Sequence, residues 1–108
     1  MKINGNIYNS ILLVFALESE AGKEFENFEK VFVGIGKIKA TYNLRKAIHQ
    51  FNPDLIINLG TAAGSLTFDI GSVVTCNRFI QRDMDVQGLG FKKFETPFSN
   101  EPILLEYG

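Results

Sequence analysis

The chain has 108 residues, of which 45% are hydrophobic and 21% are charged, and its formal net charge is −1. This length is typical of one small domain, and the composition excludes an intrinsically disordered protein. Lysine and arginine never cluster beyond a pair, so the basic patch of a nucleic-acid-binding protein is missing. We therefore expect residues 1–108 to form a single domain with no nucleic-acid partner.

The cysteine content and the first residues bear on the cellular compartment. Cys76 is the one cysteine, which excludes an internal disulfide and fits a reducing compartment. The segment Met1 to Ser10 is polar, and the apolar run Ile11 to Leu17 is too short to cross a membrane. We expect a cytoplasmic protein that makes no use of a membrane.

The first half of the chain alternates between strand and helix patterns. The continuous apolar run from Ile11 to Ala16 suits a strand buried on both faces, and apolar residues at helical spacing predict amphipathic helices. The predicted elements are, in order, a strand over Ile11–Ala16, a helix over Glu18–Glu29, a strand over Val31–Val33, a helix over Lys37–Phe51 and a strand over Leu55–Leu59.

The second half carries weaker patterns. Apolar residues within Ser72–Gln81 predict a fourth strand, and Cys76 within it is expected to be a small buried side chain. From Asp83 onward, glycines and prolines predict mostly loop, with a short strand over Ile103–Leu105.

Alternating strands and helices indicate right-handed crossovers in a mostly parallel sheet, which is an α/β fold. Ligands bind such sheets at the carboxyl ends of the strands. Three loops of unusual composition follow strands and should share that edge: Ala16–Glu20, Gly34–Lys37 and Gly60–Ser65. Their convergence predicts a binding site.

Each loop has two interpretations that the residues alone leave open. Glu18 and Glu20 follow a strand, where a partly desolvated carboxylate can have a raised pKa and act as a general base. Acids in the first turn of a helix also simply complement its dipole. The glycines of the other two loops permit either close approach of a ligand to the backbone or a tight packing turn. His49 and Cys76 lack metal-ligand spacing, so we expect no metal and no cofactor.

Taken together, these segments resemble a known family. Ala16-Leu17-Glu18-Ser19-Glu20 is similar to the Ala-Met-Glu-x-Glu segment of methylthioadenosine/S-adenosylhomocysteine nucleosidases, in the purine/uridine phosphorylase superfamily. Gly34-Ile35-Gly36-Lys37-Ile38-Lys39-Ala40 resembles their Gly-Ile-Gly-Lys-Val-x-Ala, and the stretch from Pro53 to Gly64 resembles their Pro-Asp-x-Ile-Ile-Asn-x-Gly-Ser/Thr-Ala-Gly-Gly. The match keeps its order from Ile11 to about Phe98 and corresponds to the N-terminal half of the family.

The resemblance implies a fold and a biological setting. The fold would be a three-layer, nucleoside phosphorylase-like α/β structure, with a mostly parallel or mixed sheet between flanking helices, here incomplete. The protein would be a homodimer that acts on a small-molecule nucleoside in nucleoside catabolism and methionine salvage. In family dimers, the loop spanning about Phe91 to Phe98 approaches the partner's substrate pocket.

The resemblance also assigns roles to residues. Glu20 matches the glutamate that orients and deprotonates the attacking water, and Thr61 matches the Ser/Thr beside that water and the ribose. Ile35 matches a residue lining the substrate pocket, and Ala62 and Ala63 match backbone neighbours of the ligand. The family's ribose-binding Met-Glu segment and purine-protonating Ser-Asp segment have no counterpart here.

Three functions therefore remain open at the level of sequence. The first is hydrolysis of the N-glycosidic bond of a methylthioadenosine-like nucleoside, with a second half of the fold required for activity. The second is a nucleoside phosphorylase, although a carboxylate at the position of Glu20 would repel phosphate. The third is a catalytically inactive, truncated binding protein.

Overall fold

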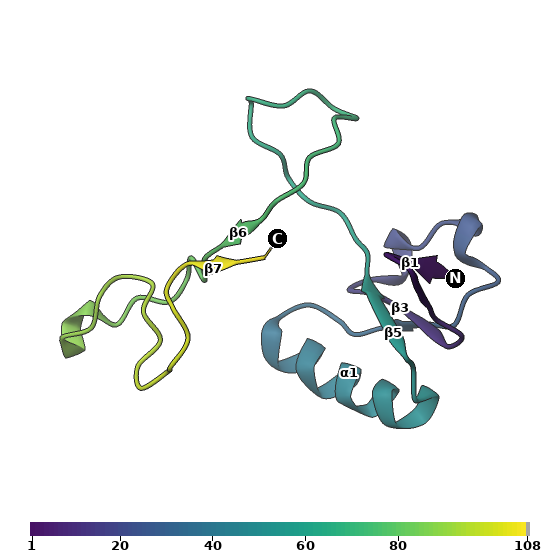
Figure 1. The fold of residues 1–108 in the computed structure, drawn as a ribbon, viewed down its shortest axis with the longest axis horizontal. Coiled ribbons are helices and arrows are strands. Elements are labelled where there is room, and N and C mark those ends of the chain that lie inside the picture. The colour runs from purple at the N-terminus through teal and green to yellow at the C-terminus, as the bar shows by residue number, and fades with distance from the viewer. Residues whose placement is uncertain (108) are drawn as a thin grey trace. The chain divides into compact units, whose positions relative to one another are not determined.

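The computed structural model describes residues 1–107, and their contacts form two compact units, residues 1–63 and residues 64 onward. Figure 1 shows the chain as a ribbon. The assignment of residues 1–108 to a single domain stays a prediction.

A three-stranded parallel sheet organises the first unit. Its order is β4 (Lys30–Phe32), β3 (Ile11–Phe15), β5 (Leu55–Asn58), so the first predicted strand lies in the centre. Leu13 pairs with Ile57 of β5, and Val14 pairs with Val31 of β4. Residues 12–15 are each at most 4% exposed, as expected for a central strand that is covered on both faces. The predictions of a parallel sheet and of these three strands are confirmed, with ends within one residue.

The helix α1 (Lys37–Phe51) connects β4 to β5 and has the bounds that the sequence predicts. It runs beside the β3–β5 pair in Figure 1. Its apolar stripe packs on one face of the sheet, because side chains three and four positions apart share a helix face. The resulting core comprises Leu12, Val14, Val33 and Ala47, with Val31, Ala40, Leu44 and Phe51 packed against it.

The face of the sheet opposite α1 is covered by aromatic rings and not by a second long helix. The ring centroid of Phe15 lies 5.4 Å from that of Phe25 and 6.1 Å from that of Phe32. The intervening chain forms two short 3₁₀ helices, η1 (Glu18–Glu20) and η2 (Lys23–Phe25). The predicted helix over Glu18–Glu29 is therefore wrong. Among the described residues α1 is the one α-helix, so the three-layer arrangement stays a prediction.

The physical reason for this error lies in Glu20 and Gly22. The Glu20 carboxylate accepts hydrogen bonds from the backbone N–H groups of Ala16 and Leu17, which bends the chain back on itself. Gly22 then lies in extended backbone, with φ −77° and ψ 175°, and interrupts any helix through this segment. Apolar spacing alone could not reveal this side-chain competition with the helix.

A hairpin precedes the sheet, where the sequence analysis anticipated only a polar segment. Strands β1 (Lys2–Ile3) and β2 (Asn6–Ile7) pair antiparallel. Asn4 and Gly5 both have positive φ, 49° and 83°, as a two-residue type I′ turn requires. The Asn-Gly dipeptide between short strands was the signal that could have predicted it.

Asp54 joins the amino ends of β3 and β5. Its carboxylate accepts hydrogen bonds from the N–H groups of Asn9 and Ser10, both at 2.9 Å. In return, the N–H groups of Asp54 and Leu55 donate to the Ser10 carbonyl at 2.9 and 3.1 Å. The hydrogen bond from Asn9 has the largest effect and lowers the pKa of Asp54. Desolvation raises that pKa and the bond from Ser10 lowers it, so the pKa of Asp54 stays below its usual value.

The second unit contains little regular structure. Strands β6 (Arg78–Phe79) and β7 (Leu105–Glu106) form a two-stranded antiparallel sheet, and η3 (Gln87–Leu89) is a single 3₁₀ turn. The predicted strand over Ser72–Gln81 is thus reduced to two residues, and the one over Ile103–Leu105 is shifted to β7. Cys76 is exposed, contrary to expectation.

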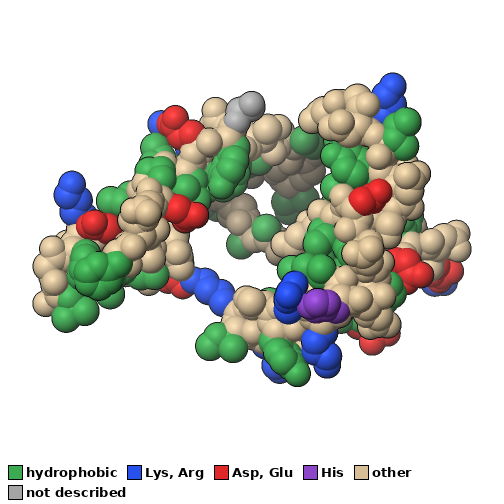
Figure 2. All heavy atoms as spheres, turned by 60° about the horizontal axis from the view of Figure 1, so that its bottom comes forward, with side chains coloured by type: hydrophobic (Ala, Val, Ile, Leu, Met, Phe, Trp, Pro, Cys, Tyr) green, Lys and Arg blue, Asp and Glu red, His purple; other side chains and the backbone are tan. Residues whose placement is uncertain are grey.

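Exposed apolar side chains explain why these strands are short. Among residues 1–107, all of the buried hydrophobic side chains lie in the first unit, while Leu66, Val73 and Phe98 of the second unit are each at least 95% exposed. A strand persists only where a neighbour pairs with it and its apolar face is covered. Hydrophobic side chains accordingly reach the surface in Figure 2. None of the helices within residues 1–107 combines the length and the apolar character needed to cross a bilayer.

The central position of Leu12 yields a stability prediction. Leu12→Ala removes a side chain that is 0% exposed and should lower the free energy of unfolding by about 2–5 kcal/mol. Leu66→Ala deletes the same atoms from a fully exposed position and should change it by less than about 0.5 kcal/mol. Urea unfolding followed by circular dichroism measures both. Equal losses in the two variants would contradict the described core.

Candidate functional site

The carboxyl ends of β3 and β5 meet at one edge of the sheet, as parallel pairing requires. Glu20 follows β3, and Thr61 follows β5. The Thr61 hydroxyl donates to Glu20 Oε1 at 2.9 Å, and the Thr61 N–H donates to the same oxygen at 3.1 Å. The other oxygen, Oε2, accepts from the N–H groups of Ala16 and Leu17 at 3.1 and 3.0 Å. One carboxylate therefore joins two loops that are 41 residues apart in the sequence.

A cavity of about 330 Å³ opens at this junction. Its lining combines one carboxylate, one hydroxyl, one amide and small or backbone groups: Ala16, Glu20, Asn58, Leu59, Gly60, Thr61 and Ala62. A Cβ atom at Gly60 would lie 3.3 Å from Glu20 Oε1, which is closer than side chains normally approach. Glycine at this position thus lets the carboxylate rest against the backbone.

The electrostatics of Glu20 differ from the expectation. Burial was expected to raise its pKa, but the hydrogen bond from Leu17 and the two bonds from Thr61 outweigh desolvation and lower the pKa from its ordinary value of 4.5. Donors that point at an ionised carboxylate stabilise its charged form, and this site is open enough for desolvation to be the smaller effect. Glu20 is consequently a carboxylate at neutral pH.

The structure brings together three of the five residues singled out from the sequence. Glu20, Thr61 and Ala62 line the cavity, whereas Ile35 and Ala63 are absent from its lining. The Ile35 side chain is 71% exposed. It lies between Gly34 and Gly36, whose φ angles of 84° and 95° make a turn that favours glycine. The assigned roles of all five residues in substrate binding or catalysis stay predictions.

The loop that contains Ile35 nevertheless reaches the same edge of the sheet. The Gly34 N–H donates to the Ala16 carbonyl at 2.9 Å, directly beside the strand end that carries the Glu20 loop. All three loops that the sequence placed at the carboxyl edge are therefore found there.

Asn58 is a lining residue that the sequence analysis did not select. It is the last residue of β5 and pairs with Val14, so its polar side chain interrupts an otherwise apolar strand next to the cavity. A polar residue at the carboxyl end of an apolar strand was the available signal.

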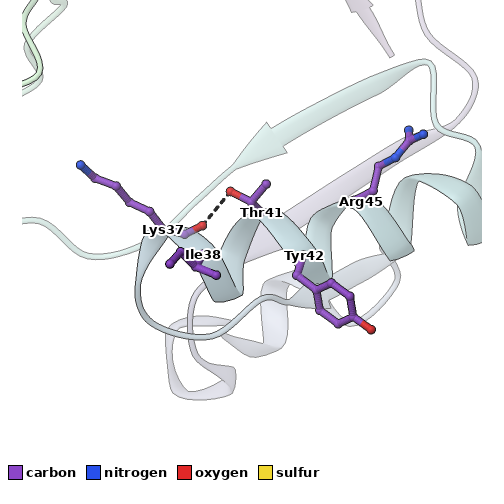
Figure 3. Close-up of a pocket in the computed structure, with 5 residues that line it drawn as sticks. All are labelled: Lys37, Ile38, Thr41, Tyr42 and Arg45. Atoms are coloured by element: carbon purple, nitrogen blue, oxygen red, sulfur yellow. Dashed lines mark hydrogen bonds between the residues drawn. The ribbon is translucent and has the colours of Figure 1, made fainter. Parts of the chain in front are cut away.

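A second and larger hollow, of about 480 Å³, lies on the outer face of α1. Figure 3 shows Lys37, Ile38, Thr41, Tyr42 and Arg45 around it, with the Thr41 hydroxyl donating to the Lys37 carbonyl at 2.7 Å. Ile38 and Tyr42 are 89% and 64% exposed. The lining holds basic and apolar groups but no carboxylate. The smaller cavity, which contains the Glu20 carboxylate, is therefore the better candidate for general acid–base catalysis. Within residues 1–107, no group of three or more His, Cys, Asp and Glu residues could hold a metal ion.

Comparison with known proteins identifies the family. The sequence model of the Phosphorylase superfamily matches residues 22–106 of this chain. The chain belongs to the phosphorylase superfamily. The matched range includes Thr61 and Ala62 but begins two residues after Glu20.

Two individual proteins are similar to part of this chain. The 5'-methylthioadenosine/S-adenosylhomocysteine nucleosidase of Geobacillus sp. (strain WCH70) is 37% identical over 65 residues, which is 59% of this chain and 28% of that protein. The nucleosidase of the same name from Staphylococcus epidermidis is 31% identical over 80 residues, 68% of this chain and 35% of its own length. The chain thus spans about a third of these relatives. They confirm the resemblance to this nucleosidase family.

The lowered pKa of Glu20 predicts that the stability of the fold decreases at acid pH. Because the folded-state pKa lies below 4.5, the ionised carboxylate stabilises the fold above that pH, and the stabilisation is lost as the pH falls through the folded-state pKa. Glu20→Gln should therefore lower stability at pH 7 and flatten its decline below about pH 4.5. Urea unfolding midpoints between pH 3 and pH 7 measure this dependence.

Glu18→Gln is the matched control, since the Glu18 side chain takes no part in the four hydrogen bonds to Glu20. It should preserve the pH dependence of the unmodified chain. Identical pH curves for Glu20→Gln and the unmodified chain would show that these hydrogen bonds contribute nothing to folding.

Proposed function

We propose that this chain supplies the water-activating side of a purine nucleosidase, in which Glu20 orients the water that cleaves an N-glycosidic bond. The observation that carries the proposal is the hydrogen-bonded contact of Glu20 with Thr61 inside a cavity at the carboxyl edge of a parallel sheet. Membership of the phosphorylase superfamily and the printed names of the nucleosidase relatives support it.

The chemistry suits an ionised carboxylate. Cleavage of a nucleoside passes through a sugar with oxocarbenium character, so negative charge near the reacting carbon stabilises the transition state. Glu20, with its lowered pKa, holds that charge at neutral pH. It is a weak base in the ground state and accepts the water's proton late, when the positively charged sugar has made that water acidic.

The same charge favours hydrolysis over phosphorolysis. A nucleoside phosphorylase must hold a phosphate anion beside the sugar, where the Glu20 carboxylate would repel it. Water carries no net charge and can donate to a carboxylate oxygen. We therefore propose water as the nucleophile, and added inorganic phosphate should not raise the rate of purine release.

The finer assignments rest on the resemblance and the relatives. We propose 5'-methylthioadenosine or S-adenosylhomocysteine as the substrate, a homodimer as the working form and the cytoplasm as its place in methionine salvage. Ile35 and the backbone of Ala62 and Ala63 would contact the nucleoside. Ribose binding and purine protonation would need segments that have no counterpart in these 108 residues.

A chimera tests the role of Glu20. The 108 residues of this chain would replace the corresponding part of the Geobacillus nucleosidase, and adenine release from 5'-methylthioadenosine would be followed by chromatography. We expect turnover that falls by roughly 10²–10⁴-fold in the Glu20→Gln chimera, while the dissociation constant for the nucleoside changes much less. The Glu18→Gln chimera is the control and should retain turnover.

Retained turnover in the Glu20→Gln chimera would remove Glu20 from the mechanism. Turnover that requires phosphate would replace the nucleosidase proposal with the phosphorylase alternative. Thermal unfolding of each chimera separates a chemical loss from a failure to fold.

The 108-residue chain by itself should release adenine very slowly or not at all. The described residues carry the water-activating side, and without a proton donor the purine leaves as an unstable anion. The same chromatographic assay on the isolated chain measures this rate against a protein-free control. Clear turnover would show that these residues already contain a complete site.

A further inference from the structure

The side of α1 that faces away from the sheet carries apolar side chains where a surface helix normally exposes polar ones. Leu44 and Ala47 belong to the inner stripe that packs on the sheet. Ile38 and Tyr42 lie on the opposite side, are 89% and 64% exposed, and border the hollow of about 480 Å³ shown in Figure 3. An exposed apolar pair beside a hollow is typical of an interaction surface. We call five residues the outer face of α1: Ile38, Thr41, Tyr42, Arg45 and Lys46.

Positive charge surrounds this apolar pair. The helix contains four lysine and arginine residues and neither Asp nor Glu. Arg45 and Lys46 are exposed, and the Lys46 Nζ lies 5.3 Å from the ring centroid of Tyr42. A complementary surface must therefore offer apolar side chains together with carboxylates.

The segment 17–29 of the same chain has this composition. It holds five glutamates and a single lysine. Leu17 and Phe28 are 44% and 38% exposed. Four of the glutamates are also exposed: Glu18, Glu24, Glu26 and Glu29. This acidic segment thus combines apolar groups with a charge opposite to that of the outer face of α1.

Internal contacts hold the acidic segment in a defined shape. The ring centroid of Phe25 lies 5.4 Å from that of Phe15 and 6.4 Å from that of Phe28. The Lys30 ammonium donates to the Phe25 carbonyl at 3.0 Å and to the carbonyls of Glu26 and Phe28 at 3.4 Å. A surface that is already ordered loses less conformational entropy when a partner binds.

The two surfaces lie on opposite sides of the first unit. Leu12 and Val14 belong to the core on which α1 packs, whereas Phe25 packs against Phe15. Successive side chains of a strand point to opposite faces of the sheet, so α1 and the acidic segment cover different faces. They can therefore meet only between two copies of the chain.

We propose that the outer face of α1 binds the acidic segment of a second copy of this chain, in a head-to-tail contact. Ile38 and Tyr42 pack against the apolar side chains of that segment, and Arg45 and Lys46 face its glutamates. Each copy keeps one surface of either kind available, so further copies can add. This contact goes beyond the proposed function and does not depend on nucleosidase activity.

Other occupants fit the outer face of α1 less well. A two-fold contact between two outer faces would bring Arg45 and Lys46 of both copies together, and like charges repel. A nucleic acid would match the positive charge, but its phosphates would leave the exposed Ile38 side chain without an apolar partner.

Reversal of charge on each surface tests the contact in the full 108-residue chain. In sedimentation velocity at low ionic strength, we expect the unmodified chain to associate as its concentration rises. Arg45→Glu with Lys46→Glu should weaken this association by at least about 10-fold, because like charges then face each other. Glu24→Lys with Glu26→Lys should do the same from the other side. Added salt should weaken the association of the unmodified chain.

Two further variants separate position from net charge. Lys2→Glu with Lys92→Glu is the matched control, since it gives the same net charge as the α1 reversal at exposed positions outside both surfaces. It should associate like the unmodified chain. Ile38→Ser alters no charge and should weaken association by removing an apolar contact. Circular dichroism of each variant verifies that α1 is retained.

A mixture of the two charge-reversed variants is the decisive measurement. Neither should associate alone, but the unaltered acidic segment of the α1 variant can bind the unaltered α1 of the other. Mixing should therefore restore association, and Ile38→Ser in both partners should abolish it again. Non-specific attraction between oppositely charged chains would survive Ile38→Ser.

Three results would overturn the head-to-tail contact. The first is a mass of the unmodified chain that does not depend on concentration. The second is association that persists in both charge-reversed variants, and the third is restored association that Ile38→Ser leaves unchanged. A two-fold dimer through another surface would be present in every variant, so only association beyond that dimer supports the contact.

Discussion

The parallel pairing of β3 with strands on both of its sides is the constraint on which the rest of the first unit depends. It buries residues 12–15 between α1 and the aromatic rings, and it brings three loops to one edge. Two of these loops then exchange hydrogen bonds through Glu20 and Thr61. The candidate site is thus a product of strand direction as much as of the residues themselves, because antiparallel strands would place the two loops at opposite edges.

Sequence patterns predicted a helix that is specified by local residues and a strand that is buried on both faces. The bounds of α1 could be predicted because its apolar stripe repeats at helical spacing and Asn52-Pro53 ends it. The strand β3 could be predicted because a continuous apolar run suits burial on both faces. In both cases one segment carries the whole signal.

The predictions that were wrong concern segments whose structure depends on contacts with other parts of the chain, which a local sequence pattern does not show. The segment Glu18–Glu29 has helical apolar spacing, but Phe25 packs against Phe15 and Glu20 turns back to bond the backbone, so only short 3₁₀ turns form. Ser72–Gln81 has the apolar content of a strand, yet only Arg78 and Phe79 find a partner, in β7. The direction of the Glu20 pKa shift was missed as well. Its largest cause, the bond from Leu17, exists only because the chain turns back on itself, and the bonds from Thr61 come from 41 residues away in the sequence.

Asp54 and Glu20 together determine how β3 and β5 align. Asp54 bonds the backbone before β3 at one end of the pair, and Glu20 bonds Thr61 at the other. A slip of one residue between these strands would turn the half-buried Leu55 and Ile57 side chains to the opposite face and would break both carboxylate contacts at once. Each contact thus excludes the shifted pairing at its own end. The two strands, although distant in sequence, therefore have one favoured register. Glu20, which has a proposed role in catalysis, also helps to select that register.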